Sequence, residues 1–343
     1  MSLPSPVQIT VILPVHDGAA TLGGALDALA RSQFDAFETI VVDDASADGS
    51  ADLAAAHDGV EVVRLDRRVG PSAARNIGAE RARGEILFFT DADVRVRDDT
   101  LAKIRAHFDD ANTDAAIGLY SAEHPNRDVC SRYKNHWIRH SYLQAGREVG
   151  WFFTAVGAVR RRTFEELGGF DGAFQASTGG GDTDFGRRAR VAGHRIVLDK
   201  SLEVTHQKRF DLRALLLNDL RRSYGWSRAA LGRSRNLAAH ASGGFANVDR
   251  SFVGGTVAAA CTLAAAVVSP WIPAVAAIAG GMSMVAFVGL AAPFLEYCRR
   301  EESAGFAAAA AAILFVDQAA CAVGIAAAVA GRAVGNAPGP DVP

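Results

Sequence analysis

The sequence has few cysteines for its length, and they form no pattern typical of a metal site or a disulfide framework. Four cysteines, at positions 130, 261, 298 and 321, occur in a chain of 343 residues, and two of them lie within apolar segments. A structural zinc site needs closely spaced pairs of cysteine or histidine, and a disulfide-stapled secreted domain needs a dense, even set. Both classes are excluded, and a reducing compartment suits the polar part of the chain best.

Three further signals are missing from the sequence. The formal net charge is only −2, so nothing in the overall charge favours a polyanion such as nucleic acid as a partner. The stretch from Met1 to Pro14 has no basic start and no small-residue cleavage site, so we expect no signal peptide there. The glycine-rich motifs of dinucleotide-binding and P-loop proteins are absent, which argues against both classes.

Charge is unevenly distributed along the chain. Charged residues are dense up to Arg250, and none occurs in the 45 positions from Ser251 to Leu295. The length allows one large or two modest domains. The sequence therefore predicts a polar domain over residues 1–210, an interfacial helix and linker over 211–250, an apolar part over 251–331 and a disordered tail over 332–343.

Short apolar runs alternate with helical patterns in the first third of the chain. We expect strands at 8–13, 39–42, 60–65, 86–89 and 115–119, and helices at 21–31, 50–57, 71–83 and 100–108. Such alternation predicts an α/β fold with a mostly parallel, doubly wound sheet.

The stretch Glu85–Val94 carries the strongest functional signal. Its apolar run 86–89 suits a strand buried on both faces of a parallel sheet, and Asp91 and Asp93 follow it directly. In extended backbone, residues two apart point the same way, so both carboxylates could converge on a divalent cation, which prefers oxygen ligands. A solvated acidic turn is the alternative, and the buried strand before the pair favours the metal.

Polar residues also follow the first two expected strands. His16 and Asp17 come after the first, and Asp43 and Asp44 come after the second. Ligands of open α/β sheets bind beyond the carboxyl ends of the strands, so these acids could bind the ribose and base of a nucleotide. Loops of this kind are also rich in Asp as turn residues. Nucleotide binding and a turn-forming role are equally consistent with Asp17, whereas nucleotide binding is favoured for Asp44.

Four segments together resemble the family 2 glycosyltransferases, which have a GT-A fold. They are VILPVHDGAATL, ETIVVDDASADGS, RRVGPSAARNIGAERARGEILFFTDAD and GGFDGAFQASTGGGDTDFGRRARVAG, and the resemblance covers roughly residues 7–206. The resemblance implies a nucleotide-diphosphate sugar donor bound by Pro14, Asp17, Asp43, Asp44, Arg75, Asp91 and Ala92. By this resemblance Asp44 would bind the nucleoside, Asp91 the ribose or sugar, and Asp93 and His206 a divalent cation, Mg or Mn. The alternative for Arg75 is an ordinary position on a helix surface. The alternative for His206 is a purely structural role.

The glycine-rich stretch 179–185 resembles the motif that carries the catalytic base of the family. Gly181 stands where the family has Glu, and Asp182 would take a proton from the acceptor hydroxyl. The alternative is that Asp182 or Asp184 caps the helix running to Ala192. The three glycines indicate a loop that could close over substrate. By the same resemblance the acceptor region would include Trp151, Gly180, Gly181, Asp184 and Arg188.

Two segments could contact a membrane surface. The aromatic and basic segment 121–150 could cover an acceptor at such a surface, and a packed helix with a basic face is equally consistent with it. Leucines at helical spacing after residue 211, flanked by arginines, predict an amphipathic helix suited to an anionic bilayer surface. An ordinary surface helix is the alternative there.

The apolar part predicts transmembrane helices at about 252–269, 274–295 and 304–331. A bilayer core takes about 20 helical residues, and a buried soluble bundle is the alternative. Arginines before the first helix and after the second put both ends on the cytoplasmic side, with the catalytic domain. A third crossing would leave the tail outside. Asp317 in mid-membrane would be costly unless it faces protein or water, and helix packing is its expected role.

Taken together, the sequence and the resemblance imply a membrane-anchored, multi-pass, metal-dependent glycosyltransferase of the hexosyltransferase type. That it inverts the anomeric centre is implied by the resemblance alone. Its acceptor would be a hydroxyl of a lipid or lipid-linked glycan, and no nucleic acid partner is expected. The first alternative is a polyprenyl-phosphate sugar synthase, whose phosphate acceptor needs no base. A nucleotidyltransferase and a non-catalytic membrane protein that binds nucleotide sugars are the other two.

Overall fold

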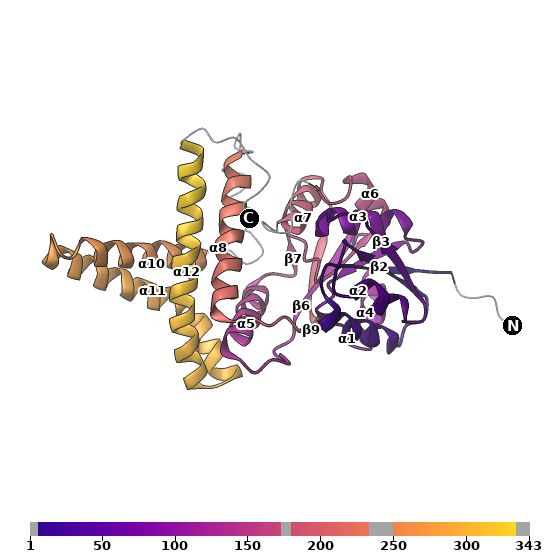
Figure 1. The fold of residues 1–343 in the computed structure, drawn as a ribbon, viewed down its shortest axis with the longest axis horizontal. Helices are drawn as coiled ribbons and strands as arrows, with labels where there is room; N and C mark the ends of the chain where they lie inside the picture. The colour runs from indigo at the N-terminus through magenta and orange to yellow at the C-terminus, as the bar shows by residue number, and fades with distance from the viewer. Residues whose placement is uncertain (1–5, 173–179, 233–249, 334–343) are drawn as a thin grey trace. The chain divides into compact units, whose positions relative to one another are not determined.

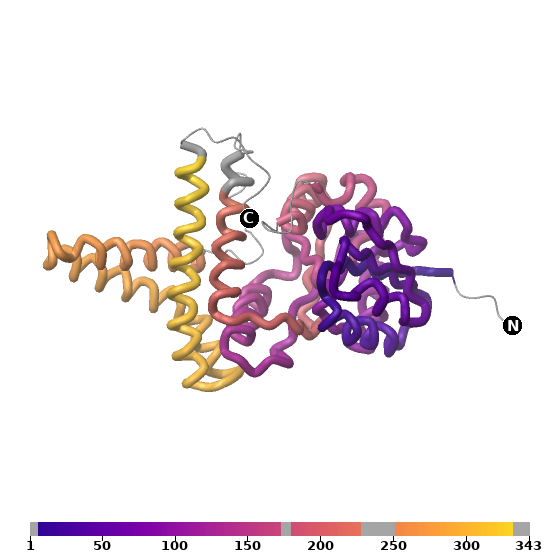
Figure 2. The backbone as a smooth tube through the Cα atoms, in the orientation of Figure 1, coloured from indigo at the N-terminus to yellow at the C-terminus, as the bar shows by residue number. Residues whose placement is uncertain are grey.

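The computed structural model describes residues 6–172, 180–232 and 250–333, shown in Figures 1 and 2. The described chain divides into two compact units. The first lies within residues 1–208 and contains the sheet; the second is formed by Arg127–His140 and by the chain from Arg209 onward. The predicted tail at 332–343 lies almost entirely outside the described residues.

A nine-stranded mixed sheet forms the first unit. Its strands are β1 (Ile9–Val15), β2 (Phe37–Asp43), β3 (Val60–Arg64), β4 (Ile86–Thr90), β5 (Val94–Arg95), β6 (Ala115–Tyr120), β7 (Glu148–Val149), β8 (Val156–Arg160) and β9 (Ile196–His206). The order is β3-β2-β1-β4-β8-β6-β9-β5, and β7 pairs with β9. Strands β1 to β4 are parallel, β6 is parallel to β9, and β8 is antiparallel to both β4 and β6. The predicted α/β fold with a largely parallel sheet is therefore confirmed.

The helices of this unit follow the strands as the alternation predicts. They are α1 (Ala19–Ala30), α2 (Ser50–Ala55), α3 (Pro71–Arg81), α4 (Thr100–His107), α6 (Arg161–Glu166) and α7 (Gly181–Val191). Pro71 occupies the first turn of α3, where its missing N–H costs no hydrogen bond.

Two strand boundaries differ from those expected. Strand β1 continues through Pro14 to Val15, because its pairing with β4 ends at Ile12 and the proline therefore needs no N–H on that side. The apolar run 151–159 becomes a strand, β8, only from Val156, and residues 151–153 are irregular. Strand β9 continues to His206, which brings this residue to the site described below.

A cluster of phenylalanines packs the later helices against the sheet. Phe89 of β4 contacts Phe164 of α6 and Phe170, with ring centroids 5.3 and 5.0 Å apart. Phe185 of α7 contacts Phe170 and Phe152 at 5.1 and 5.2 Å. Each such aromatic pair stabilises the fold by about 0.5–1.5 kcal/mol beyond the area it buries. The cluster therefore holds the start of α7 in a defined position relative to β4.

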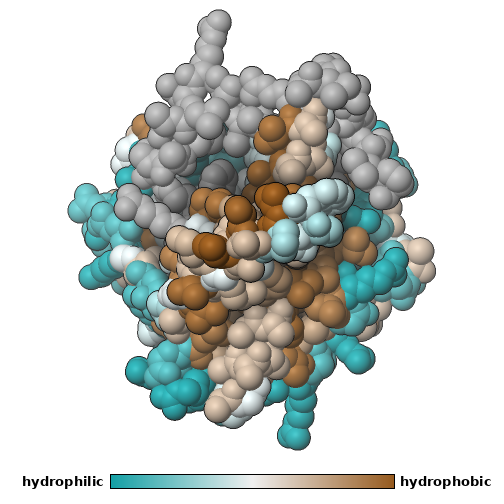
Figure 3. Space-filling model, turned by 90° about the vertical axis from the view of Figure 1, so that its left-hand side faces the viewer, coloured by the Kyte–Doolittle hydropathy of each residue, from teal (hydrophilic) through white to brown (hydrophobic). Residues whose placement is uncertain are grey.

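The second unit is helical. It contains most of α5 (Val129–Gln144), together with α8 (Leu212–Gly232), α10 (Arg250–Val268), α11 (Pro273–Glu301) and α12 (Ala304–Ala333). In the described chain, three of these helices, α10, α11 and α12, are long and apolar enough to cross a membrane. Many of their large apolar side chains are exposed, including Val267, Ile278, Met282 and Val285, and hydrophobic residues gather on the face shown in Figure 3.

Helix α5 decides between the two interpretations of segment 121–150. Tyr133 and Trp137 of α5 are buried against Phe294 of α11, with ring centroids 5.9 and 4.9 Å apart. Arg132 is ion-paired with Glu302 at 2.6 Å. The segment is thus a packed helix with an aromatic inner face.

Candidate active site

The two aspartates after β4 lie in a turn and have different partners. The N–H of Val94 donates to the carbonyl of Asp91 at 3.0 Å, so the backbone turns here and the argument from extended strand geometry does not apply to these two residues. Asp91 Oδ1 accepts a hydrogen bond from Arg75 at 2.6 Å. Asp93 Oδ2 lies 3.7 Å from His206 Nε2. The two carboxylates therefore have partners from different elements, Arg75 of α3 and His206 of β9.

Strand pairing brings His206 to Asp93 from the far end of the domain. Val94 of β5 is the register partner of His206, and the N–H of Gln207 donates to the carbonyl of Asp93 at 2.7 Å. The imidazole stacks on Tyr120 of β6 with ring centroids 4.4 Å apart. Burial raises the pKa of Asp93, but His206 and the charge of Lys208 lower the pKa by more, so it lies below the usual value. Asp93 is therefore ionised at neutral pH.

The pair Asp93 and His206 fits two positions in the coordination shell of a divalent cation. A carboxylate oxygen suits Mg²⁺ and Mn²⁺, and an imidazole nitrogen is a common ligand of transition metals, so the mixed set favours Mn²⁺. Two ligands bound at right angles to one cation lie roughly 3 Å apart, close to the 3.7 Å observed. Among the residues that the structure describes, no group of three or more acidic, histidine or cysteine side chains could hold a metal. A cation here would need further oxygens, such as those of a diphosphate.

Arg75 is a buried partner of Asp91. Its side chain is 10% exposed, so the alternative of a helix-surface arginine is wrong. Its Nε has no hydrogen-bond partner in the described part of the chain. Arg75 thus orients Asp91 and retains one donor for a ligand.

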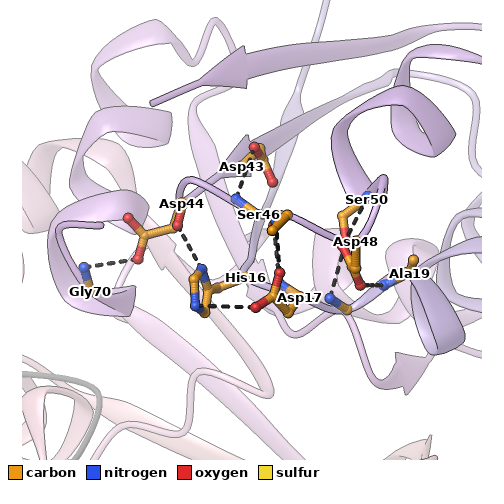
Figure 4. A network of polar contacts seen from close by, with 11 residues as sticks. His16, Asp17, Ala19, Asp43, Asp44, Ser46, Asp48, Ser50 and Gly70 are labelled. Carbon is orange, nitrogen blue, oxygen red and sulfur yellow. Dashed lines mark hydrogen bonds and ion pairs between the residues drawn. The ribbon is translucent and has the colours of Figure 1, made fainter. Parts of the chain in front are cut away.

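Both oxygens of the Asp44 carboxylate are used inside the protein. Oδ1 accepts from the N–H of Val69 at 2.6 Å and Oδ2 from that of Gly70 at 2.9 Å (Figure 4). The carbonyl of Asp44 lies 2.8 Å from His16 Nδ1. Asp44 therefore ties the end of β2 to the loop before α3, and this structural role was not foreseen from the sequence.

The neighbouring Asp43 has a free oxygen. Its side chain is buried, and Oδ2 is 3.4 Å from the N–H of Ser46. Oδ1 is buried without a hydrogen-bond partner among the described residues. An unsatisfied buried carboxylate oxygen costs free energy unless a ligand supplies a donor. Asp43 therefore fits a nucleoside contact better than Asp44.

Asp17 fastens the loop after β1 to the loop after β2. Its backbone has a positive φ of 50°, its N–H donates to Ser46 Oγ at 3.0 Å, and its Oδ1 accepts from Ala47 N–H at 2.8 Å. Asp48 accepts hydrogen bonds from the N–H of Ala19 and from the N–H and hydroxyl of Ser50, which lower its pKa. These contacts, drawn in Figure 4, hold the two loops together.

The remaining two residues expected at the donor site lie near the same edge. Pro14 is half-buried in β1, next to the loop that begins with His16. Ala92 is buried, and a Cβ on Gly18 would lie 3.4 Å from the Ala92 Cβ. The loop after β1 and the turn after β4 are therefore adjacent.

The N-terminus of α7 separates the roles of the two aspartates there. Gly180 is the N-cap residue, with φ 94°, so the interpretation of Asp182 or Asp184 as the cap is wrong. Asp182 Oδ1 accepts from the N–H of Thr183 at 2.8 Å, and its other oxygen has no hydrogen bond within the described chain. Gly179 lies outside the described residues, and Gly181 is buried in the first turn of α7.

Asp184 is buried and ion-paired rather than open to an acceptor. It contacts Arg187 at 3.1 Å and Arg188 at 2.8 Å. Arg188 also donates to the carbonyls of Leu167 and Gly169 at 2.5 and 2.7 Å. This pair therefore fastens α7 to the turn after α6.

Trp151 lies against the same helix. A Cβ on Gly186 would collide with the backbone of Trp151 and Phe152, so glycine permits this close approach. The indole Nε1 of Trp151 is buried with no hydrogen-bond partner in the part of the chain that the structure describes. It is thus a donor available to a ligand.

Sequence reasoning missed Asn76. Its side-chain amide accepts from the N–H of Phe170 at 2.9 Å and donates to the carbonyl of Phe170 at 2.8 Å, across 94 positions of sequence. Asn76 directly follows Arg75 on α3, and only this adjacency to a predicted site residue could have indicated it. The same helix therefore supports both the Asp91 turn and the turn that leads to α7.

Comparison with known proteins finds a family model that matches part of the chain. The model of glycosyl transferase family 2 matches residues 10–168. A pre-mycofactocin glycosyltransferase of Mycobacterium tuberculosis is 29% identical over 243 residues, which are 66% of this chain and 48% of that protein. Glycosyltransferase AglE of Haloferax volcanii is 26% identical over 59% of this chain and 67% of its own length. The match thus spans about half of the Mycobacterium relative.

Solved structures agree on the fold. A mannosyltransferase of Pyrobaculum calidifontis, solved with GDP-Man and Mn²⁺, superimposes with a TM-score of 0.60 at 23% identity, covering 89% of this chain and 87% of that one. TarS of S. aureus in complex with UDP-GlcNAc gives a TM-score of 0.51 at 15% identity over 94% and 92%. Residues 10–168 therefore match the family 2 glycosyltransferases, the first unit has the GT-A fold, and three apolar helices long enough to cross a membrane follow it in the described chain.

Proposed function

We propose that the protein is a membrane-anchored, metal-dependent glycosyltransferase that moves a hexose from a nucleotide-diphosphate sugar to a hydroxyl of a lipid or lipid-linked acceptor. The pairing of Asp93 with His206 beside the Arg75–Asp91 pair carries this proposal, because it combines an ionised carboxylate, an imidazole and a buried guanidinium at one strand end. GDP-Man and Mn²⁺ in the mannosyltransferase structure support a donor and a cation of this kind.

The residues divide the work as follows. Asp43 accepts a hydrogen bond from the nucleoside. Arg75 orients Asp91, which binds the ribose or sugar. Asp93 and His206 would hold Mg²⁺ or Mn²⁺, which when bound would supply positive charge to stabilise a diphosphate leaving group. Asp182 takes the proton of the acceptor hydroxyl while the hydroxyl oxygen attacks the anomeric carbon. The nucleoside diphosphate leaves from the opposite face, so the configuration at this carbon is inverted.

A second candidate is a synthase that transfers the sugar to a polyprenyl phosphate. It is favoured by 40% identity over 101 residues, covering 27% of this chain and 30% of the relative, to an undecaprenyl-phosphate 4-deoxy-4-formamido-L-arabinose transferase of Pseudomonas paraeruginosa. A phosphate acceptor is already ionised at neutral pH and needs no base. Asp182, with an oxygen left open in the described chain, favours the hydroxyl acceptor.

The membrane anchor supports an acceptor that lies in the bilayer, and the arginines at 299 and 300 favour a cytoplasmic catalytic domain. The test is turnover of detergent-solubilised protein with a panel of nucleotide sugars, lipid extract and Mn²⁺, followed by mass spectrometry and NMR of the product anomer. We expect a nucleoside diphosphate and an inverted glycolipid, with loss of product in EDTA. Release of pyrophosphate would mean nucleotidyl transfer, and absence of turnover with every donor would contradict the proposal.

A further inference from the structure

Helix α12 is the third candidate membrane span, and its buried face runs along its whole length. Buried residues recur every three or four positions: Phe306, Ala310, Leu314, Asp317, Cys321, Gly324 and Ala328. The opposite face consists of small apolar residues and exposed valines such as Val316 and Val323. One side of α12 therefore packs against protein, and the other has no protein partner among the described residues.

The protein partner of that face is mainly α8, which runs beside α12 in the same direction. Cys321 Sγ lies 3.8 Å from the carbonyl of Asp219, and one turn further on Gly324 packs so closely on Ser223 and Leu220 that a Cβ would not fit. The inner face of α8 thus includes Asp219 and Ser223. The helix predicted to lie alone on a bilayer surface is paired with α12 instead.

Helix α8 is too polar to cross a membrane. It carries Arg213, Asn218, Asp219, Arg221 and Arg222, and the side chains of Arg213 and Arg221 are exposed. Arg221 lies in the middle of α8, so in a transmembrane α8–α12 pair it would lie near the bilayer centre, where an exposed arginine is strongly disfavoured. Because α12 and α8 run side by side, α12 cannot cross without taking these arginines with it.

The α10–α11 hairpin has the opposite character. At its base it contacts α12: Gly255 packs on Gln318, and Phe287 contacts Phe315 with ring centroids 5.2 Å apart. Nearer the tip, Gly280 of α11 packs on Ala265 of α10, and Figures 1 and 2 show the hairpin extending crosswise from α12.

Exposed side chains cover this outer part of the hairpin on all sides. They include Val267, Trp271, Val275, Ile278 and Met282, each more than 60% exposed. If the hairpin bound a second copy of the chain through one face, its other faces would be polar. Apolar residues on all faces are instead typical of a helix pair surrounded by lipid. From Pro273 to Phe287 the helix rises by about 21 Å, against a hydrocarbon core of about 30 Å.

We propose that the α10–α11 hairpin inserts into a lipid bilayer while α12 lies along the bilayer surface beside α8. The loop at residues 302–303 and the end of α12 then remain on the same side of the membrane, contrary to the topology expected from segment length. Asp317 then lies at the bilayer surface and faces protein. There Tyr133 donates a hydrogen bond to its Oδ2 at 2.9 Å, next to the ion pair of Lys134 and Asp219.

The first test is the topology of the full-length chain. Epitope tags are placed between Glu302 and Ser303 and, in a second version, after Pro343, and sealed vesicles of known orientation are treated with protease. We expect both tags to be cleaved from the same side. Cleavage from opposite sides would overturn the proposal, since it would require α12 to cross.

A matched pair of lysine substitutions tests lipid depth independently of tags. Ile278→Lys places a charge on the outer hairpin, 66% exposed, and Val316→Lys places one at the centre of α12, 43% exposed. We expect Ile278→Lys to lower the insertion equilibrium by roughly 10²-fold and Val316→Lys to leave it within about twofold, because an interfacial lysine reaches water. Carbonate-resistant membrane protein is the readout.

Equal loss in the two variants would place α12 in the hydrocarbon core and overturn the proposal. Release of the unmodified protein by carbonate would overturn it as well, since the exposed hairpin would then bind protein rather than lipid.

Discussion

Replacing Asp182 by asparagine tests the role of this residue in proton transfer separately from its role in the stability of the fold. Gly180, not Asp182, caps α7, and the asparagine oxygen can still accept the hydrogen bond that Asp182 Oδ1 takes from Thr183 N–H. The loss of one negative charge in the first helical turn costs about 0.3–1 kcal/mol. The folded state should therefore survive with a small fall in Tm.

The effect on turnover should be much larger. A positioned general base contributes roughly 10²–10⁴-fold, which corresponds to about 2.7–5.4 kcal/mol of transition-state stabilisation. Donor affinity should barely change, because Asp93 and His206 are untouched. The assays are initial rates with acceptor, calorimetry with a nucleoside diphosphate and Mn²⁺, and thermal unfolding in detergent.

Asp184→Asn is the matched control, two residues further along α7. Asp184 is buried and accepts charged hydrogen bonds from Arg187 and Arg188 at 3.1 and 2.8 Å. Its loss should lower the free energy of unfolding by about 1–3 kcal/mol, since the two arginines remain partly solvated. Turnover per folded molecule should fall far less than in Asp182→Asn. Normal turnover in folded Asp182→Asn protein would refute the hydroxyl-acceptor mechanism and favour a phosphate acceptor.

Three further outcomes follow from single contacts. Asp93→Ala should abolish metal-dependent nucleotide binding while leaving Tm nearly unchanged, and unaltered affinity in calorimetry would remove Asp93 from the metal site. Asn76→Asp keeps the acceptor for the Phe170 N–H but places a carboxylate oxygen against the Phe170 carbonyl, so Tm and turnover should both fall. Equal Tm and turnover in the variant and the unmodified protein would exclude this positioning role. The hydrogen bond with His107 lowers the pKa of Asp199, so this pair stabilises the fold above a pH of about 4 and the effect is lost as pH falls; acid unfolding should be less pH-dependent in Asp199→Asn than in the unmodified protein.

The candidate site shows where sequence reasoning stops. The strand-end position of Asp91 and Asp93 follows from the buried run before them, and the structure bears out that position. Their partners do not follow, because Arg75 and His206 reach them from α3 and from the end of β9. Likewise, two adjacent aspartates end the second strand region, and only the loop before α3 determines that Asp44 is saturated while Asp43 keeps an open oxygen.

The sequence alone determined the elements whose signals are local. Alternation of apolar runs with helical patterns predicted the α/β sheet, and the charge-free run from Ser251 predicted long apolar helices, because periodicity and hydropathy act over neighbouring residues. Tertiary structure alone decided the pairing of α8 with α12, which joins Asp219 to Cys321 across about a hundred positions. It also decided which polar atoms remain open, since an oxygen is satisfied or left free only by groups that folding brings to it from elsewhere in the chain.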